Sequence, residues 1–130
     1  MTVPVLGAHT FGFAWDCAAE EAIPQLADAG YRTVQLMATP PHFDPWRHDA
    51  ARTRRIGALI ERYGLSLLAL DLASSDINLA SPSADVVDFA VEAYSSAIDR
   101  AAELGARWIC VGSGRRHALL AKANDRLMTS

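Results

Sequence analysis

The sequence predicts an α/β fold in which parallel strands alternate with covering helices. One pattern occurs three times: a helix-like stretch, a glycine and then an apolar run, as in "LADAGYRTVQL", "IERYGLSLLAL" and "AAELGARWICV". The glycines, Gly30, Gly64 and Gly105, stand at the same place in each copy, where glycine suits the left-handed turn that ends a helix. The apolar runs are short and flanked by turn residues, which is typical of strands and argues against an all-helical repeat. The three copies therefore indicate repeated βα units.

The composition favours a single folded domain over residues 1–130. Apolar residues make up 51% of the chain and charged residues 21%, which is enough for a core. The net charge of −3 argues against nucleic acid as a partner, because phosphate binding needs a basic surface. No apolar run is long enough to cross a membrane, and we see no signal peptide. Cys17 and Cys110 belong to no CxxC pair, so we expect free thiols and a cytoplasmic location.

The first strand and helix are the least clearly marked. The strand is expected within "VPVLGAHTFGF", residues 3–13, and the helix over about residues 16–29. Pro24 lies inside this helix, and a proline removes a backbone donor from a helix interior. The helix therefore either starts late or kinks at Pro24, and the strand "TVQLM" follows it.

The second helix is expected to begin at Asp44-Pro45, because aspartate is a favoured N-cap and proline suits the first turn. Its apolar stripe consists of Ile56, Leu59, Ile60 and Tyr63. The strand "SLLALDL" follows this helix after Gly64.

Ser81-Pro82 repeats the start signal for a long third helix. Its expected apolar stripe consists of Val87, Val91, Tyr94, Ile98 and Ala101. The fourth strand is "RWICV", and "HALLAKANDRLM" is a short possible helix after it. The predicted order is thus β-α-β-α-β-α-β.

Two architectures fit this order. Right-handed βαβ units form either an open sheet with helices on both faces or a closed barrel with all helices outside. A complete barrel needs eight units, and this chain carries four strands. The sequence therefore predicts half of a (β/α)8 barrel, with four parallel strands and outer helices.

The segment "INLASPSADVVDFAVEAYSSAIDRAAELGARWICVGSGRR" resembles the xylose isomerase-like TIM barrel superfamily. That superfamily includes sugar phosphate isomerases and epimerases, inosose dehydratases and type IV apurinic endonucleases. The matching features are Asn78-Leu79, the long third helix, residues 102–106 and the glycine loop at 112–114. "LADAGYRTVQL" is similar to the junction before the family's second strand, where the family often has glutamate in place of Gln35.

The resemblance implies proton transfer next to a sugar carbonyl, assisted by a divalent metal such as Mn, Mg, Co or Zn. In the superfamily, Glu, Asp, His and Glu from strands five to eight hold that metal, and two of these glutamates are the acid and the base. We therefore expect no catalytic residue, no metal ligand and no activity in this chain alone. Either the chain is a truncated piece of a longer product, or it is a natural half-barrel that joins another half.

Active-site groups of α/β barrels lie at the carboxyl ends of the strands. A polyol substrate needs several hydrogen-bonding groups on one rim. Seven residues at these positions are predicted to contact a sugar: His9, Trp15, Gln35, Asp71, Asn78, Ser113 and Arg115. The same strand ends also carry Thr10, Thr39, Arg116 and His117.

Each candidate also has a plainer interpretation. His9 fits a buried histidine that bonds to the backbone, and Asp71 fits a turn cap. Trp15 and Phe13 fit a cover over the barrel mouth. His42 and His48, which flank Trp46, are expected in a solvated loop.

The stretch "GSGRRH" after the fourth strand offers backbone amides and arginines that suit an anion. However, the phosphate site of such barrels usually follows strands seven and eight, and the stretch matches neither a P-loop nor GxGxxG. A glycine-rich rim loop is the favoured interpretation, with anion contact as the alternative.

Four strands leave the barrel interior half covered and two sheet edges open, which invites association. We expect a homodimer or a partner half-barrel, with no nucleic acid and no membrane. Two functions follow from this. The chain either supplies the substrate-side half of a sugar or sugar phosphate isomerase or epimerase, or it is a non-catalytic half-barrel that oligomerises. A dehydratase or DNA-repair relative is a weaker third option.

Overall fold

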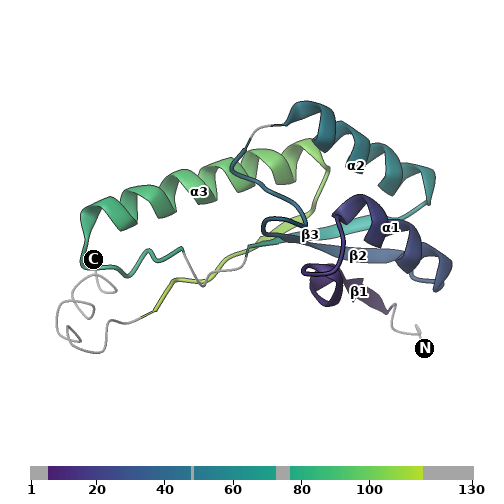
Figure 1. Ribbon diagram of the computed structural model, residues 1–130, viewed down its shortest axis with the longest axis horizontal. Helices are drawn as coiled ribbons and strands as arrows, with labels where there is room; N and C mark the ends of the chain where they lie inside the picture. Colours follow the sequence, from purple (N-terminus) through teal and green to yellow (C-terminus); the bar gives the residue numbers. More distant parts are fainter. Residues whose placement is uncertain (1–5, 48, 73–76, 116–130) are drawn as a thin grey trace.

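A computed structural model describes residues 6–47, 49–72 and 77–115 of the chain, and it forms one four-stranded parallel sheet (Figure 1). The strands are β1 (Gly7–His9), β2 (Thr33–Ala38), β3 (Ser66–Leu72) and β4 (Trp108–Cys110). The helices are α1 (Ala19–Asp28), α2 (Ala50–Arg62) and α3 (Ala84–Glu103), with a short 3-10 helix, η1 (Thr10–Phe13), after β1.

The strand order distinguishes the two predicted architectures. The order is β1-β2-β3-β4, so each strand pairs with the one before it along the chain. An open doubly wound sheet reverses its order at a switch point, whereas a barrel adds each strand on the same side. The helices also lie in chain order, because α1 packs beside α2 and α2 packs beside α3 (Figure 1). The sheet therefore has the order of part of a (β/α) barrel, as predicted.

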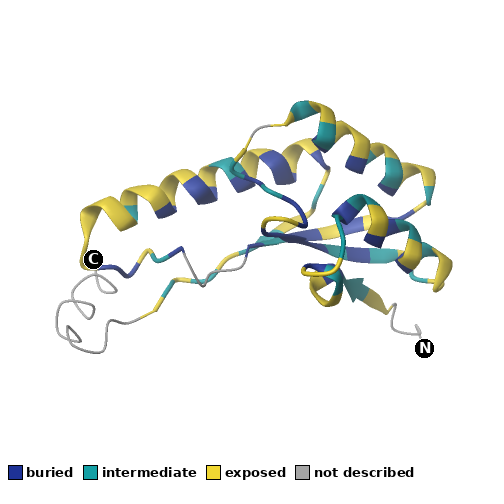
Figure 2. Cartoon of the chain, viewed as in Figure 1, coloured by how far each residue is buried: buried dark blue, intermediate teal, exposed yellow. Residues whose placement is uncertain are grey.

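The core lies between the helices and the sheet. Val34 and Leu36 of β2 and Leu67 and Leu70 of β3 face the helices and are buried. The residues that alternate with them lie on the opposite face, where Gln35 and Asp71 are half-buried and Met37 and Ala69 are buried. Figure 2 shows the burial of each part of the sheet. The sheet thus carries one apolar face under the helices and one face open to polar contacts.

The glycines end their helices as predicted. Gly30, Gly64 and Gly105 have φ values of 94°, 61° and 70°, in the left-handed region where other residues are strained. Each glycine follows a helix and precedes a strand within a few residues. The repeated sequence pattern is therefore the αβ junction of each unit.

The beginning of the chain differs in detail from the prediction. The described part of the first strand is only Gly7–His9, because Thr10–Phe13 turns into η1. The first helix begins at Ala19, three residues after the expected start, and Pro24 still lies inside it. The possible terminal helix "HALLAKANDRLM" lies outside the described residues.

The predicted start of α2 at Asp44-Pro45 is wrong. Asp49 is the N-cap, and its Oδ1 accepts a hydrogen bond from the Arg52 amide at 2.9 Å. Asp44 instead closes a turn, accepting from the Trp46 and Arg47 amides at 3.0 and 3.1 Å. An aspartate can either cap a helix or close a turn. The sequence alone therefore did not show that Asp44 closes a turn before the helix.

The predicted stripe of α3 is partly wrong. The helix begins at Ala84 with Ser83 as its N-cap, so the predicted start at Ser81-Pro82 is two residues early. It buries Tyr94 and Ala101 as expected. However, Val91 and Ile98 are 52% and 54% exposed. The helix instead buries small side chains, chiefly Ala90, Ala93 and Ala97. Figure 2 shows that much of the end of α3 that extends past the sheet is exposed.

None of the helices in the described ranges is both long enough and apolar enough to cross a membrane.

Candidate functional site

Three predicted site residues from three neighbouring strands meet on the polar face of the sheet. Asp71 Oδ2 accepts a hydrogen bond from His9 Nε2 at 2.8 Å and another from Gln35 Nε2 at 3.2 Å. Gln35 Nε2 also lies 3.4 Å from Cys110 Sγ on β4. We call His9, Gln35 and Asp71 the polar cluster.

Strand register explains this meeting. His9 pairs with Gln35 across β1 and β2, and Asp71 pairs with Cys110 across β3 and β4. Paired residues in parallel strands point to the same face. A register shift at Val34/Gln35 leaves Leu68 without a partner on β2. All these side chains consequently lie on the face away from the helices.

The hydrogen bonds determine the tautomer of His9. The Phe11 amide donates to His9 Nδ1 at 2.8 Å, so Nδ1 of the neutral ring carries no proton. The proton therefore resides on Nε2, which donates it to Asp71. The His9 and Asp71 side chains are 31% and 28% exposed, so the polar cluster is accessible to a ligand.

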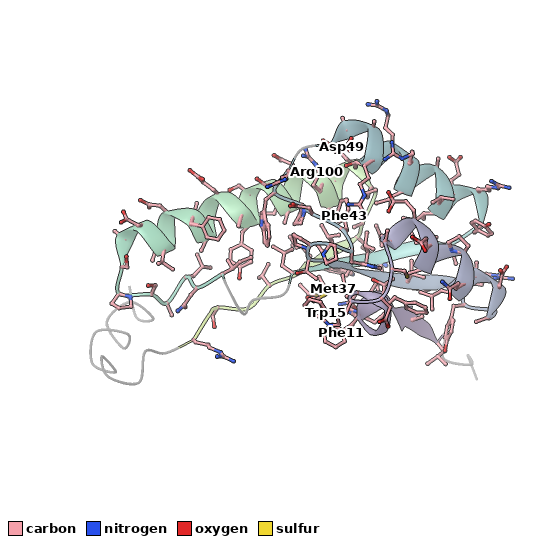
Figure 3. The ribbon with its side chains drawn as sticks, viewed as in Figure 1. Phe11, Trp15, Met37, Phe43, Asp49 and Arg100 are labelled. Carbon is pink, nitrogen blue, oxygen red and sulfur yellow. The ribbon has the colours of Figure 1, made fainter. Side chains whose placement is uncertain are left out.

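Two aromatic side chains stand on the segment that follows β1. Phe11 is 55% exposed, and its ring meets the His9 ring edge-on with centroids 6.2 Å apart. Trp15 is 68% exposed on the same segment (Figure 3). Sequence reasoning missed Phe11, although its position two residues after a strand-end histidine was the available signal.

The other three predicted residues lie on loops beyond the strands. The Asn78 side-chain amide donates to the Arg115 carbonyl and accepts from the Arg115 amide, both at 3.0 Å. Asn78 thus binds the two loops together through backbone contacts. Ser113, two residues before Arg115, is exposed. It lies on the segment after β4, which runs away from β1 (Figure 1). The structure does not bring these residues to the polar cluster.

Gly114 and Tyr94 support this second region. Gly114 has a φ of 101°, and a Cβ at this position would overlap Asn78 Oδ1. The Tyr94 hydroxyl donates to the Gly112 carbonyl at 2.6 Å, while burial raises the pKa of Tyr94. The glycine loop therefore packs closely on Asn78. Arg116 and His117, the rest of the predicted anion contact, lie outside the described residues.

His42 is a correction to the predicted solvated loop. Its side chain is fully buried, with Thr10 buried beside it. The loop folds inward because Thr10 and the Cys17 carbonyl hydrogen-bond to both ring nitrogens. Trp46 is half-buried against Phe89, with ring centroids 6.3 Å apart. His48 lies outside the described residues.

A recess of about 250 Å³ adjoins the polar cluster. Its lining is Gly7, Ala8, His9, Thr33, Val34, Gln35 and Leu68. A separate recess of about 310 Å³ lies at the start of α2, between the Pro40-Pro41 turn and Arg52. Only the first recess shares residues with the polar cluster, so we take it as the candidate site.

The described side chains do not fit a divalent metal. Over residues 6–47, 49–72 and 77–115, no group of three or more His, Cys, Asp or Glu side chains is arranged to hold an ion. Within the polar cluster, His9 and Asp71 bond to each other, and the second ring nitrogen of His9 bonds to Phe11. The geometry is that of a hydrogen-bonding site.

Solved structures resemble this fold over part of their length. A D-tagatose 3-epimerase-like protein is 18% identical with a TM-score of 0.75, and the match covers 95% of this chain and 45% of that protein. D-Allulose 3-epimerase from Methylomonas sp. is 22% identical with a TM-score of 0.64, covering 94% and 44% respectively. An AP endonuclease of family 2 from Brucella melitensis is 19% identical with a TM-score of 0.67, covering 96% and 46%. The chain thus spans less than half the length of these three proteins.

The family model described as "Xylose isomerase-like TIM barrel" matches residues 23–130. No curated protein matches the sequence. The model covers most of the chain, and the strand order and the solved structures agree with it. The chain therefore belongs to the xylose isomerase-like TIM barrel family, as its sequence resemblance predicted.

Proposed function

We propose that this chain supplies the N-terminal, substrate-side part of a sugar or sugar phosphate epimerase- or isomerase-like barrel. The observation that carries the proposal is the convergence of His9, Gln35 and Asp71 from three strands on one face. The similarity to a solved D-allulose 3-epimerase and to a D-tagatose 3-epimerase-like protein supports a sugar as the ligand. The chain's own role is to bind and orient that sugar.

The polar cluster has acceptors left for sugar hydroxyls. Within the described part of the chain, Asp71 Oδ1 and Gln35 Oε1 receive no hydrogen bond. Hydroxyl groups donate well to a carboxylate, and such bonds are stronger than neutral ones. Phe11 and Trp15 are exposed and offer apolar surface to the C–H side of a sugar ring. The cluster therefore combines polar and apolar contacts suited to a polyol.

We assign no catalytic residue within the chain. The described residues hold no group of three or more side chains that could bind a metal. In this proposal, the metal site and the carboxylates that move protons belong to another part of a completed barrel. The chain's residues hold the substrate against that part.

Saturation-transfer NMR with D-tagatose tests this role. The wild-type chain should transfer saturation to the sugar, and Asp71→Ala should reduce the transfer severalfold because the shared acceptor is lost. Asp99→Ala, an exposed change on α3, is the matched control and should behave as wild type. Equal transfer from wild type and Asp71→Ala would refute the proposed contact.

A second candidate function, a half-barrel that pairs with a second copy of itself, is favoured by apolar exposure near β4. Trp108 and Val111 are 60% and 55% exposed, next to a strand edge that pairs with no other described strand. Val91 and Ile98 on α3 are also exposed. Light scattering at micromolar concentration should give a dimer mass, and Trp108→Lys should lower it. A wild-type monomer would contradict this candidate.

The cysteines support a reducing location for either function. Cys17 and Cys110 are both free thiols. We therefore propose that the protein acts in the cytoplasm, where thiols stay reduced.

A further inference from the structure

His42 lies in the segment between β2 and α2, and its fully buried ring bonds at both nitrogens. Nδ1 lies 2.7 Å from the Cys17 carbonyl oxygen, and Nε2 lies 3.0 Å from the Thr10 hydroxyl. Neither partner belongs to the same segment as His42. The ring therefore joins the β2–α2 segment to two points of the β1–α1 segment.

The donors and acceptors allow one arrangement. A carbonyl oxygen only accepts, so in the neutral His42 ring Nδ1 carries the proton and Nε2 is an acceptor. Nε2 therefore accepts a hydrogen bond from the Thr10 hydroxyl. The same hydroxyl oxygen accepts from the Met37 amide at 2.9 Å. Because β1 ends at His9 while β2 runs on to Ala38, Thr10 takes the place of a ladder partner for β2.

This arrangement reaches the polar cluster through the chain itself. Thr10 directly follows His9 and opens the 3-10 helix that carries Phe11. Cys17 comes two residues after Trp15. We propose that His42 is a positioning residue, which sets the placement of the segment bearing His9, Phe11 and Trp15 by holding Thr10 at one end and Cys17 at the other.

The backbone of His42 is itself held firmly. Its carbonyl oxygen accepts from Arg52 Nη2 at 2.5 Å and from the Ala19 amide at 3.1 Å. Arg52 in turn makes a two-pronged ion pair with Glu20, at 2.9 and 3.0 Å. His42 therefore transmits the position of α1 and α2 to the site segment.

Acid should break the hydrogen bond from the Thr10 hydroxyl to His42 Nε2. The charged and titratable groups that face His42 are Arg52 on α2, Glu20 on α1 and His9 on β1. Burial lowers the pKa of His42, and the Arg52 charge lowers it further, against the opposing effects of the Cys17 carbonyl and Glu20. A protonated ring donates from both nitrogens, so the Thr10 hydroxyl loses its acceptor.

Hydrogen exchange followed by NMR tests the inference without any sugar. Thr10→Val removes the hydroxyl at similar volume, and amide exchange at both Met37 and Phe11 should quicken by roughly tenfold. Thr10→Ser keeps the hydroxyl and should stay within about twofold of wild type. Wild-type exchange at Phe11 in Thr10→Val would overturn the inference.

A pH titration of the wild-type chain covers the case in which Thr10→Val fails to fold. Imidazole nitrogen shifts report protonation of His42, and the Trp15 indole signal reports the site segment. The His42 nitrogen shifts and the Trp15 indole signal should change over the same pH range. A Trp15 signal that stays constant while His42 titrates would overturn the inference. The part that concerns sugar contact rests on the proposed function. If the Trp15 signal changes with His42 protonation but D-tagatose does not bind, only the proposed function is contradicted.

Discussion

Asp71 on β3 accepts a hydrogen bond from His9 on β1, although β2 lies between the two strands. The side chains meet because both point away from the helices, and Gln35 of β2 donates to the same Asp71 oxygen. This bond therefore spans three strands at the carboxyl end of the sheet, where barrel proteins place their sites.

Gln35→Glu tests the environment of that oxygen. It would place a second carboxylate against Asp71, where two like charges raise one pKa. We expect about 1 kcal/mol of destabilisation at pH 7. The loss in stability should shrink toward pH 4.5. At that pH one of the two carboxylates binds a proton in the folded state, which removes the repulsion between them.

Urea unfolding at pH 7 and pH 4.5 measures this effect. Gln25→Glu, on the exposed face of α1, is the matched control. It loses an exposed bond to the Glu21 carbonyl, so it should cost about 0.5 kcal/mol or less. An equal loss for both variants would show that Gln35 is not close to Asp71 in solution.

Gly114→Ala tests the packing of the glycine loop on Asn78. The added methyl would overlap the Asn78 amide, and φ at this position is in the left-handed region. We expect about 2 kcal/mol of destabilisation from these two causes. Gly12→Ala is the control, since no atom lies within 4 Å of a Cβ there. Thermal melts that shift alike for both variants would argue against the close packing of this loop on Asn78.

Arg52→Lys tests the support under His42. Lysine keeps the charge but loses the paired contact with Glu20 and the bond to the His42 carbonyl. The pair is partly exposed, so solvent screening limits the expected loss to about 1–2 kcal/mol. Arg54→Lys, an exposed change on the same helix, should change the urea midpoint little. Similar midpoints for the two variants would contradict the assigned role.

Stability should fall in mild acid. The pKa of His42 is below its ordinary value of 6.5, so the unfolded chain binds more protons and stability rises with pH in that window. It should therefore decline as pH drops below about 6.5. Burial opposes ionisation of Glu20, but the Arg52 hydrogen bond and charge outweigh it and lower the pKa of Glu20. A further decline should therefore follow below about pH 4.5.

Urea midpoints measured between pH 7.5 and pH 3.5 give the profile. Glu20→Gln should flatten the lower part. The upper decline should remain and deepen slightly, because loss of the Glu20 charge lowers the pKa of His42 further. A profile with no decline between pH 6.5 and pH 5.5 would rule out a buried neutral His42.

Local signals made the fold predictable. The helix-ending glycines and the apolar runs each act within a few residues, so Gly30, Gly64 and Gly105 marked the repeat correctly. The start of α2 failed because Asp44 and Asp49 carry the same capping signal. Only tertiary packing determines which of them begins the helix.

The site was predictable in part for the same reason. His9, Gln35 and Asp71 could be placed at strand ends, but the bond between non-neighbouring strands depends on register. The role of His42 could not be predicted, because its partners are 25 and 32 residues away in the sequence. Its proline-rich surroundings indicated solvent, whereas the fold turns the ring inward.

Chemical-shift mapping with D-tagatose tests the central claim most directly. Amide and side-chain signals of His9, Gln35 and Asp71 should shift together with one saturable curve, and the Phe11 and Trp15 signals should follow them. Shifts confined to the recess at the start of α2, or no saturable shift at all, would contradict the claim that this face of the sheet is the sugar-contacting site.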